Sequence, residues 1–266
     1  MIPNILSIAG SDPSGGAGIQ ADIKAISANG GYAMAAITGL TAQNTTGVQG
    51  VAMVAADMIA QQIASLRTDI DIHAVKIGML GDATTIETVA QSLDGLTAPI
   101  VLDPVMVAKG GDRLLAAEAV DALRTHLLPM ASLITPNLPE AADLLEQPEA
   151  TTLSQMHDQA QALLKLNCKA VFLKGGHLQD ADATDLLVTP DSTTELPAKR
   201  TLTRNTHGTG CTLSSALATQ MGHGHPLPEA AQRTKAYITA AIAAADTLSV
   251  GHGHGPVHHF HALKDA

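Results

Sequence analysis

The chain is poor in aromatic side chains and in positive charge. Tryptophan is absent, and only 2 tyrosines and 2 phenylalanines occur among 266 residues. Proteins that bind single-stranded nucleic acids stack bases on aromatic rings, and phosphate backbones are held by lysine and arginine. The scarcity of aromatics and the formal net charge of −10 therefore argue against a nucleic-acid partner. A small anionic ligand remains compatible with this charge, because a local site can be positive.

Long hydrophobic runs and cysteines are also scarce. No stretch of about 20 apolar residues occurs, as a membrane span would need. The N-terminal MIPNILSIAG has neither a basic region nor a long apolar core. We therefore expect no membrane span, no signal peptide and a cytoplasmic location. The 2 cysteines, Cys168 and Cys211, lack the spacing of a metal-binding set, which favours free thiols.

Apolar segments of strand length alternate with helical patterns along the sequence. The strand-like NILSIAG (4–10) precedes a segment with Ile19, Ile23 and Ile26 at helical spacing. Further strands are expected at 33–40, 48–54, 74–80, 98–106, 132–137, 170–176, 185–190, 193–197 and 201–206, the last three as an antiparallel finish. Further helices are expected at 83–94, 114–128, 138–146, 153–167, 208–221 and 228–249, besides one capped by Asp57 that carries Ile59, Ile63 and Leu66.

This alternation predicts one α/β domain over residues 1–266, with a mostly parallel sheet between two layers of helices. In such sheets, ligands bind beyond the carboxyl ends of the strands. The expected strand ends are Gly10–Asp12, Gln43–Asn44, Gly78–Met79, Asp103–Pro104, Asn137 and Lys174–Gly176. These residues are therefore the first candidates for a binding site.

The first glycine-rich loop, GSDPSGGAG (10–18), lies between an expected strand and an expected helix, where anions often bind. It is not a mononucleotide P-loop, because Gly16 and Ala17 stand where lysine and serine or threonine should follow. Gly16, Gly18 and Ala21 match a dinucleotide fingerprint, but the acidic residue that would hold the ribose is missing after the next strand. A tight turn with close helix packing explains the loop equally well.

The second loop opens the stretch NTHGTGCTLSSA (205–216). Gly208 and Gly210 allow backbone amides to face a ligand, and the start of the next helix favours negative charge. A phosphoryl group in transfer is a natural occupant. The alternative is a simple helix entry capped by a threonine. A helix N-terminus also predicts a lowered pKa for the thiol of Cys211.

Eight motifs occur in a fixed order and cover nearly the whole chain, from residue 4 to 261: IAGSDPSGGAGIQADIK, TAQNTTGV, KIGML, VLDPVM, TPNLPEA, LKGGH, NTHGTGCTLSSALA and GPVHHF. Together they resemble the hydroxymethylpyrimidine/phosphomethylpyrimidine kinases of thiamine biosynthesis, in the ribokinase superfamily. The resemblance implies a ribokinase-like fold and a kinase that uses ATP and Mg²⁺. Its expected substrates are hydroxymethylpyrimidine, which is phosphorylated to the monophosphate, and that monophosphate, which becomes the diphosphate. It also suggests a homodimer.

The resemblance assigns roles to residues at both loops and strand ends. The anion hole around the transferred phosphoryl group is matched by Gly208, Thr209, Gly210 and Cys211. Cys211 stands where sugar kinases of the superfamily carry an aspartate base, and whether it acts as a base or only positions substrate stays open. The pyrimidine-lining positions are matched by Gly10, Ala17, Met79 and Val105, with Gln43 facing the aminopyrimidine edge.

The nucleotide side is matched by Asn137, Lys174 and Lys235, and the Mg²⁺ ligands by Asp103 and Glu140. Each of these has a structural interpretation as well. The lysines can be solvated surface charges, and Glu140 can simply favour the first turn of its helix.

Several other interpretations stay open. Pyridoxal kinase is the nearest alternative, since pyridoxal also carries a hydroxymethyl group on a nitrogen heterocycle. A dinucleotide oxidoreductase and a non-catalytic sensor of vitamin precursors are alternatives from other classes. The histidine-rich segment 252–261 fits a structural tail better than a metal site. His207 is expected to border the nucleotide rather than to pair with Cys211 as a nucleophile.

Overall fold

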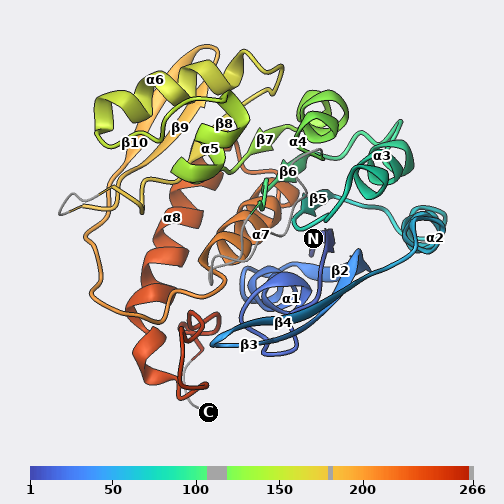
Figure 1. The fold of residues 1–266 in the computed structure, drawn as a ribbon, viewed down its shortest axis with the longest axis horizontal. Coiled ribbons are helices and arrows are strands. Elements are labelled where there is room, and N and C mark those ends of the chain that lie inside the picture. Colours follow the sequence, from blue (N-terminus) through green and yellow to red (C-terminus); the bar gives the residue numbers. More distant parts are fainter. Residues whose placement is uncertain (107–118, 179–181, 264–266) are drawn as a thin grey trace.

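The computed structural model describes residues 1–106, 119–178 and 182–263 (Figure 1). Within these residues an eight-stranded sheet has the strand order β10-β9-β8-β7-β6-β5-β1-β2. The strands span Asn4–Ala9 (β1), Tyr32–Ile37 (β2), Ala74–Ile77 (β5), Ile100–Leu102 (β6), Leu133–Ile134 (β7), Val171–Leu173 (β8), Asp185–Thr189 (β9) and Ser192–Leu196 (β10). Neighbours from β2 to β8 pair in parallel, whereas β9 and β10 are antiparallel. The predicted mostly parallel sheet is confirmed.

Helices cover both faces of this sheet, as Figure 1 shows. One face packs against α1 (Gly18–Ala28), α7 (Thr209–Gly222) and α8 (Leu227–Ala243). The other face carries α2 (Ala56–Arg67), α3 (Ala83–Ser92), α4 (Ala119–Ala122), α5 (Leu138–Leu145) and α6 (Leu153–Leu164). None of the described helices is both long enough and apolar enough to cross a membrane.

The central strands β5, β6, β7 and β8 are mostly apolar on both faces because each face is buried under helices. In β6, Val101 faces the α7 side, whereas Ile100 and Leu102 face the α3 side. The same period of two places Lys76 of β5 on the α7 side, between Val75 and Ile77 of the opposite core. The charge of Lys76 is thus held inside the molecule.

A separate hairpin stands beside the main sheet, formed by β3 (Gly39–Asn44) and β4 (Gly47–Met53). The chain leaves the sheet after β2 and returns at Val54, whose amide donates to the carbonyl of Thr38. The expectation that Gln43–Asn44 ends a strand of the main sheet is therefore wrong. Two short apolar runs look alike in sequence whether they join a large sheet or pair only with each other.

Other expectations need correction. Asp57 does not cap α2, because the helix already begins at Ala56 and its N-cap is Ala55. Residues 201–206 form a loop rather than a strand. The helix expected at 114–128 is described only from Ala119, and after α4 it continues as a π-helical turn, Leu123–Leu127.

Candidate active site

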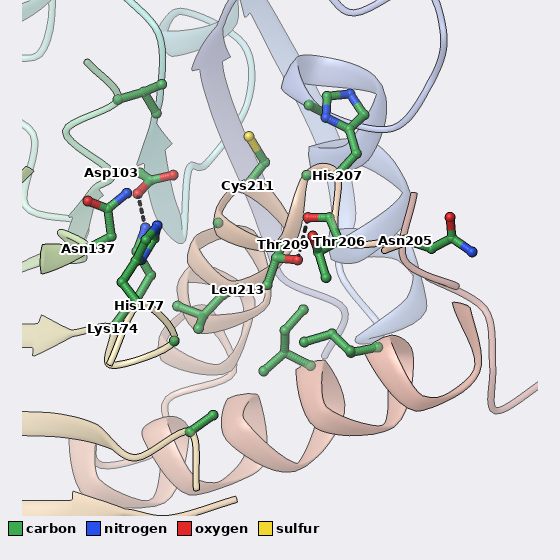
Figure 2. Close-up of a pocket in the computed structure, with 18 of the residues that line it drawn as sticks. Asp103, Asn137, Lys174, His177, Asn205, Thr206, His207, Thr209, Cys211 and Leu213 are labelled. Carbon is green, nitrogen blue, oxygen red and sulfur yellow. Dashed lines mark hydrogen bonds and ion pairs between the residues drawn. The ribbon is translucent and has the colours of Figure 1, made fainter. Parts of the chain in front are cut away.

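A cavity of about 1400 Å³ opens along the carboxyl edge of the sheet. Its walls come from the ends of β1, β5, β6, β7 and β8, from the β3–β4 hairpin, and from α7 and α8. Every residue to which the family resemblance assigns a role in the site lines it: Gly10, Ala17, Gln43, Met79, Asp103, Val105, Asn137, Glu140, Lys174, Gly208, Thr209, Gly210, Cys211 and Lys235. Of the other strand-end candidates, Asn44, Gly78, Pro104 and Gly175 do not line it. Figure 2 shows part of this cavity around the start of α7.

The first glycine-rich loop is held by the carboxylate of Asp12. Its oxygens accept hydrogen bonds from the amide of Ser14 (2.9 Å), the hydroxyl of Ser14 (2.7 Å) and the amide of Ala17 (2.8 Å). At the start of the loop, Gly10 packs so closely on Met79 that a Cβ would lie 2.6 Å from the methionine Cε. Backbone and thioether therefore form an uncharged, closely fitted wall.

The second loop forms the N-terminus of α7. Gly208 is the N-cap with φ +73°, a left-handed conformation that favours glycine. No side chain caps the helix, because the N-cap residue is glycine, and the Thr209 hydroxyl donates to the carbonyl of Thr206. The first-turn amides of Gly210 and Cys211 lack intrahelical acceptors and so are available to an anion. A Cβ on Gly210 would lie 3.2 Å from Nζ of Lys174, which places that ammonium beside the turn.

Cys211 is a free thiol that is partly exposed to the cavity. Burial raises its pKa to about 11, against the opposing effects of the Lys76 ammonium and the backbone amide of Gly18. The expectation of a lowered pKa is therefore wrong: desolvation outweighs the helix N-terminus and the nearby cation. At neutral pH, Cys211 is a neutral thiol.

Lys76 and Asp22 form a fully buried ion pair under this thiol, and sequence reasoning missed both. Nζ of Lys76 lies 2.8 Å from each oxygen of the Asp22 carboxylate. The hydroxyls of Ser7 and Ser215 donate to the same carboxylate at 2.6 and 2.8 Å. A lysine inside an otherwise apolar strand was the available signal, because buried charges are almost always paired.

A second charged cluster gathers at the ends of β6, β7 and β8. Nζ of Lys174 lies 2.9 Å from Oδ1 of Asp103 and 3.8 Å from Oε2 of Glu140, as Figure 2 shows for the first pair. Glu140 and Asn137 also form a capping box at the start of α5. Glu140 therefore stabilises the first turn of its helix, as its structural interpretation expected. The solvated interpretation of Lys174 is wrong, since its side chain is mostly buried.

The carboxyl group of Glu140 has a raised pKa. Burial raises its pKa to about 7, although the Lys174 ammonium opposes the rise and the Asp103 carboxylate adds to it. The capping box uses Oε2 of Glu140, which leaves Oε1 outside that interaction. Oδ2 of Asp103 lies 3.5 Å from the position of a Cβ on Gly210. Gly210 belongs to the first turn of α7, Gly208–Cys211, which we name the anion turn. The hard carboxylate oxygens of Asp103 and Glu140 fit Mg²⁺, which favours such ligands together with water.

Lys235 of α8 is also buried rather than solvated. Its ammonium donates to Oδ2 of Asp185 at 2.6 Å and to the carbonyl of Ala183 at 2.7 Å. Burial raises the pKa of Asp185, with Lys235 opposing it. No local pattern in the sequence indicated this partner, which lies 50 residues away along the chain.

Gln43 reaches the cavity from the β3–β4 hairpin. A break in register between Ala42 and Gln43 marks a bulge, and bulges re-aim side chains. The Thr41 hydroxyl lies 2.8 Å from the carbonyl of Ser11 and 3.1 Å from Oε1 of Gln43. The amide is thus held by a neighbour that is itself fixed on the first glycine-rich loop.

The histidine-rich tail packs onto the site from outside. The amides of Gly253 and His254 donate to the hydroxyl and carbonyl of Thr45, at the tip of the hairpin. His259 lies 3.0 Å from the hydroxyl of Thr212 in α7. Burial lowers the pKa of His259 to about 4, so this ring is neutral at neutral pH.

Known proteins resemble this chain over most of its length. The sequence pattern of the family described as phosphomethylpyrimidine kinase matches residues 12–258. The hydroxymethylpyrimidine/phosphomethylpyrimidine kinase of Salmonella typhimurium is 52% identical over 260 residues, covering 97% of this chain and 98% of that protein.

Two solved structures share the ribokinase-like fold. An ADP complex of Bacillus subtilis pyridoxal kinase is 36% identical with a TM-score of 0.90, covering 97% of this chain and 98% of that one. The phosphomethylpyrimidine kinase of Clostridium difficile is 40% identical with a TM-score of 0.80, covering 90% and 99%. With the matched pattern spanning most of its length, the chain belongs to the phosphomethylpyrimidine kinase family.

Proposed function

We propose that this protein transfers the γ-phosphoryl group of ATP to the hydroxymethyl group of 4-amino-5-hydroxymethyl-2-methylpyrimidine, and then phosphorylates the resulting monophosphate to the diphosphate. The observation that carries the proposal is the meeting, in one cavity, of all fourteen residues to which the resemblance assigns a role. A drug-sized ligand occupies a pocket of roughly 300–1000 Å³, so a cavity of about 1400 Å³ has room for a pyrimidine and a nucleotide together.

The cavity has two ends of different chemistry. We define the pyrimidine end by its five residues, Gly10, Ala17, Gln43, Met79 and Val105. We define the phosphate end by Asp103, Asn137, Glu140, Lys174 and Lys235. The amides at the start of α7 lie between them, which suits the site of transfer.

At the pyrimidine end, the Gln43 amide would donate and accept at the aminopyrimidine edge, while Met79 and the loop backbone cover the ring. At the phosphate end, Lys174 and Lys235 would neutralise phosphate oxygens. Asp103 and Glu140 would hold Mg²⁺, which when bound neutralises charge on the β- and γ-phosphates. The first-turn amides of α7 would stabilise charge on the equatorial oxygens of the transferred group.

Cys211 would act mainly by position. A thiol with a pKa of about 11 holds its own proton at neutral pH, so it is poorly matched to take one from the substrate. A loose phosphoryl-transfer transition state makes little demand on a base. We therefore propose that the Cys211 sulfur orients the hydroxymethyl group beside the anion turn.

Pyridoxal is a second candidate acceptor, because the B. subtilis relative with a TM-score of 0.90 is described as a pyridoxal kinase. Both acceptors are nitrogen heterocycles with a hydroxymethyl group. The decisive experiment is phosphorus NMR of the protein with Mg-ATP and either hydroxymethylpyrimidine or pyridoxal in parallel samples. Successive monophosphate and diphosphate signals from the pyrimidine support the proposal. Transfer to pyridoxal alone contradicts it. Transfer to neither contradicts a kinase for these two acceptors and favours the non-catalytic sensor.

We also propose a single domain that forms a homodimer. Strands from residue 4 to residue 196 share one sheet, which supports the single domain. Tyr32 on the edge strand and Leu40 and Val51 on the hairpin expose large apolar side chains that would suit a subunit interface. Light scattering after size-exclusion chromatography measures the mass directly, and a monomer at micromolar concentration would refute the dimer.

A further inference from the structure

The two glycine-rich loops contact each other directly, although they lie far apart in the sequence. Nε2 of His207 is 2.7 Å from Oδ2 of Asp12, across a separation of 195 residues. Both side chains are buried, with 9% and 2% of their surface exposed. His207 immediately precedes Gly208, the N-cap of α7, and Asp12 organises the loop that precedes α1.

The Asp12 carboxylate is the centre of this junction. The oxygen that faces His207 also accepts the amide of Ala17, and the other oxygen accepts both groups of Ser14. Burial alone would raise the pKa of Asp12, but the hydrogen bonds from His207 and Ser14 outweigh it and lower the pKa. The group is therefore an ionised carboxylate that binds its own loop and the other loop at once.

The junction has no spare room. A Cβ on Gly16 would overlap the imidazole ring of His207, and a Cβ on Gly208 would overlap the carbonyl oxygen of Gly16. The loops therefore touch through backbone as well as through the Asp12–His207 pair. A shift of one loop along the other would break these contacts together.

The outer side of His207 is fixed by the tail. Its amide donates to the carbonyl of Gly255 at 3.0 Å, and the amide of Gly255 donates to Oδ1 of Asn205 at 3.1 Å. His207 is thus held by the first loop through its ring and by the tail through its backbone. Such double support is what keeps a side chain in one orientation.

We propose that Asp12 and His207 are a positioning pair, which sets the distance between the pyrimidine end of the cavity and the amides that receive the phosphoryl group. The pair acts on Ala17 on one side and on Gly208 on the other, and it touches neither reacting atom. The backbone amide of Gly18, at the end of the first loop, also faces the Cys211 sulfur, so the same junction fixes the thiol. This inference rests on the proposed kinase function.

The test compares His207→Leu, which removes the donor, with His207→Gln, whose amide nitrogen can still donate to Asp12. His252→Leu, at an exposed histidine of the tail, is the matched control. Steady-state assays give kcat and KM for the pyrimidine and for Mg-ATP, and thermal melts report the folded state. A misplacement of about 1 Å can cost about 100-fold in rate, so we expect kcat of His207→Leu to fall about tenfold to 100-fold.

Both KM values should stay within about threefold, and His207→Gln should recover most of the rate. In the double variant with Asp12→Asn, the loss should be no larger than in the worse single variant, because the two residues act through one bond. If His207→Leu fails to fold, Asp12→Asn weakens the same bond by removing the charge of the acceptor, with little change in volume.

The proposal is overturned if folded His207→Leu turns over within threefold of wild type with a lowered melting temperature, since that describes a purely structural pair. It is also overturned if the loss lies in KM alone, if His207→Gln is as slow as His207→Leu, or if the two losses multiply in the double variant. A wild-type protein that transfers no phosphate removes the kinase function as well. An active wild type with an unaffected His207→Leu removes only the positioning pair.

Discussion

The two ends of the cavity are prepared for their ligands in different ways. At the phosphate end, each lysine already has a carboxylate partner: Lys174 lies 2.9 Å from Asp103, and Lys235 lies 2.6 Å from Asp185. At the pyrimidine end, Gln43 and Met79 sit among backbone groups and carry no charge. A charged ligand is thus met by side chains whose positions are fixed by ion pairs, and a neutral ring by a fitted surface.

The difference predicts where a substitution will be tolerated. Removing one member of a buried ion pair leaves the other charge uncompensated, which is strongly destabilising. Removing one neutral hydrogen bond typically costs about 1 kcal/mol. Changes at the phosphate end should therefore affect folding and catalysis together, and changes at the pyrimidine end should affect mainly affinity for the acceptor.

The largest effect is expected for Lys174→Met. The carboxylates of Asp103 and Glu140 lose their shared cation, and the anion turn loses the ammonium beside Gly210. We expect kcat/KM to fall by roughly 10²–10³-fold, the loss typical for one stabilising donor, together with a lower melting temperature. Lys169→Met, at an exposed lysine, is the control. Near-normal kcat/KM in the Lys174 variant would show that the phosphate end does not depend on this charge.

Cys211→Ala tests the region between the two ends. Because the thiol is neutral at neutral pH, its loss should lower kcat by about tenfold to 100-fold, toward the lower limit of the roughly 10²–10⁴ that a general base supplies. KM for both substrates should change little. Cys168→Ala, at the other free cysteine, controls for loss of a thiol. A fall in kcat of about 10⁴-fold would instead identify Cys211 as the base.

Gln43→Ala should leave the phosphate end intact. We expect KM for the pyrimidine to rise about five- to tenfold, as the loss of one or two neutral hydrogen bonds implies, with kcat and KM for Mg-ATP nearly unchanged. Gln49→Ala, at an exposed glutamine on the same hairpin, is the control. An equal rise in KM for Mg-ATP would break the distinction between the two ends.

The smallest effect on catalysis is expected for His259→Gln, which keeps a donor toward Thr212 at the base of the anion turn. The pKa of His259 falls from 6.5 to about 4 on folding. Between these pH values the unfolded chain binds a proton that the folded chain does not, so stability decreases as pH falls from 6.5 to 4. The shift corresponds to at most about 3 kcal/mol.

Denaturant titrations at pH 7, 5.5 and 4 give the free energy of unfolding of wild type and variant. The difference between the two pH dependences is the contribution of His259. His259→Gln should lose less stability than wild type over this range, with kcat unchanged at pH 7. Equal pH dependence in the two proteins would show that the buried ring does not contribute.

Local sequence patterns were enough to predict the sheet and part of the site. Apolar runs that end in Asp103, Asn137 and Lys174 identified three neighbouring strand ends, because parallel strands bring their carboxyl ends to one edge. Gln43 was placed through the family resemblance, and the hairpin that carries it was not foreseen. The predicted direction of the shift in the Cys211 pKa was wrong, because local sequence reveals where a helix starts but not how deeply the thiol is buried.

The partners of the buried charged residues could not be predicted from the sequence. Asp22 lies 54 residues from Lys76, and Asp12 lies 195 residues from His207. Each pair forms only when distant segments fold together, and no local periodicity encodes which carboxylate meets which cation. Lys76 itself could have been suspected, because a charged residue in a buried strand demands a partner.

The separation of the β3–β4 hairpin from the main sheet bears on how such enzymes diversify. The hairpin contributes Gln43 yet shares no ladder with the strands that carry Asp103 and Lys174. If Gln43 selects the acceptor as proposed, mutations in the hairpin can change which ring the enzyme accepts and leave the phosphate end intact. New acceptor preferences can therefore evolve through substitutions in the β3–β4 hairpin, while the residues of the phosphate end stay conserved.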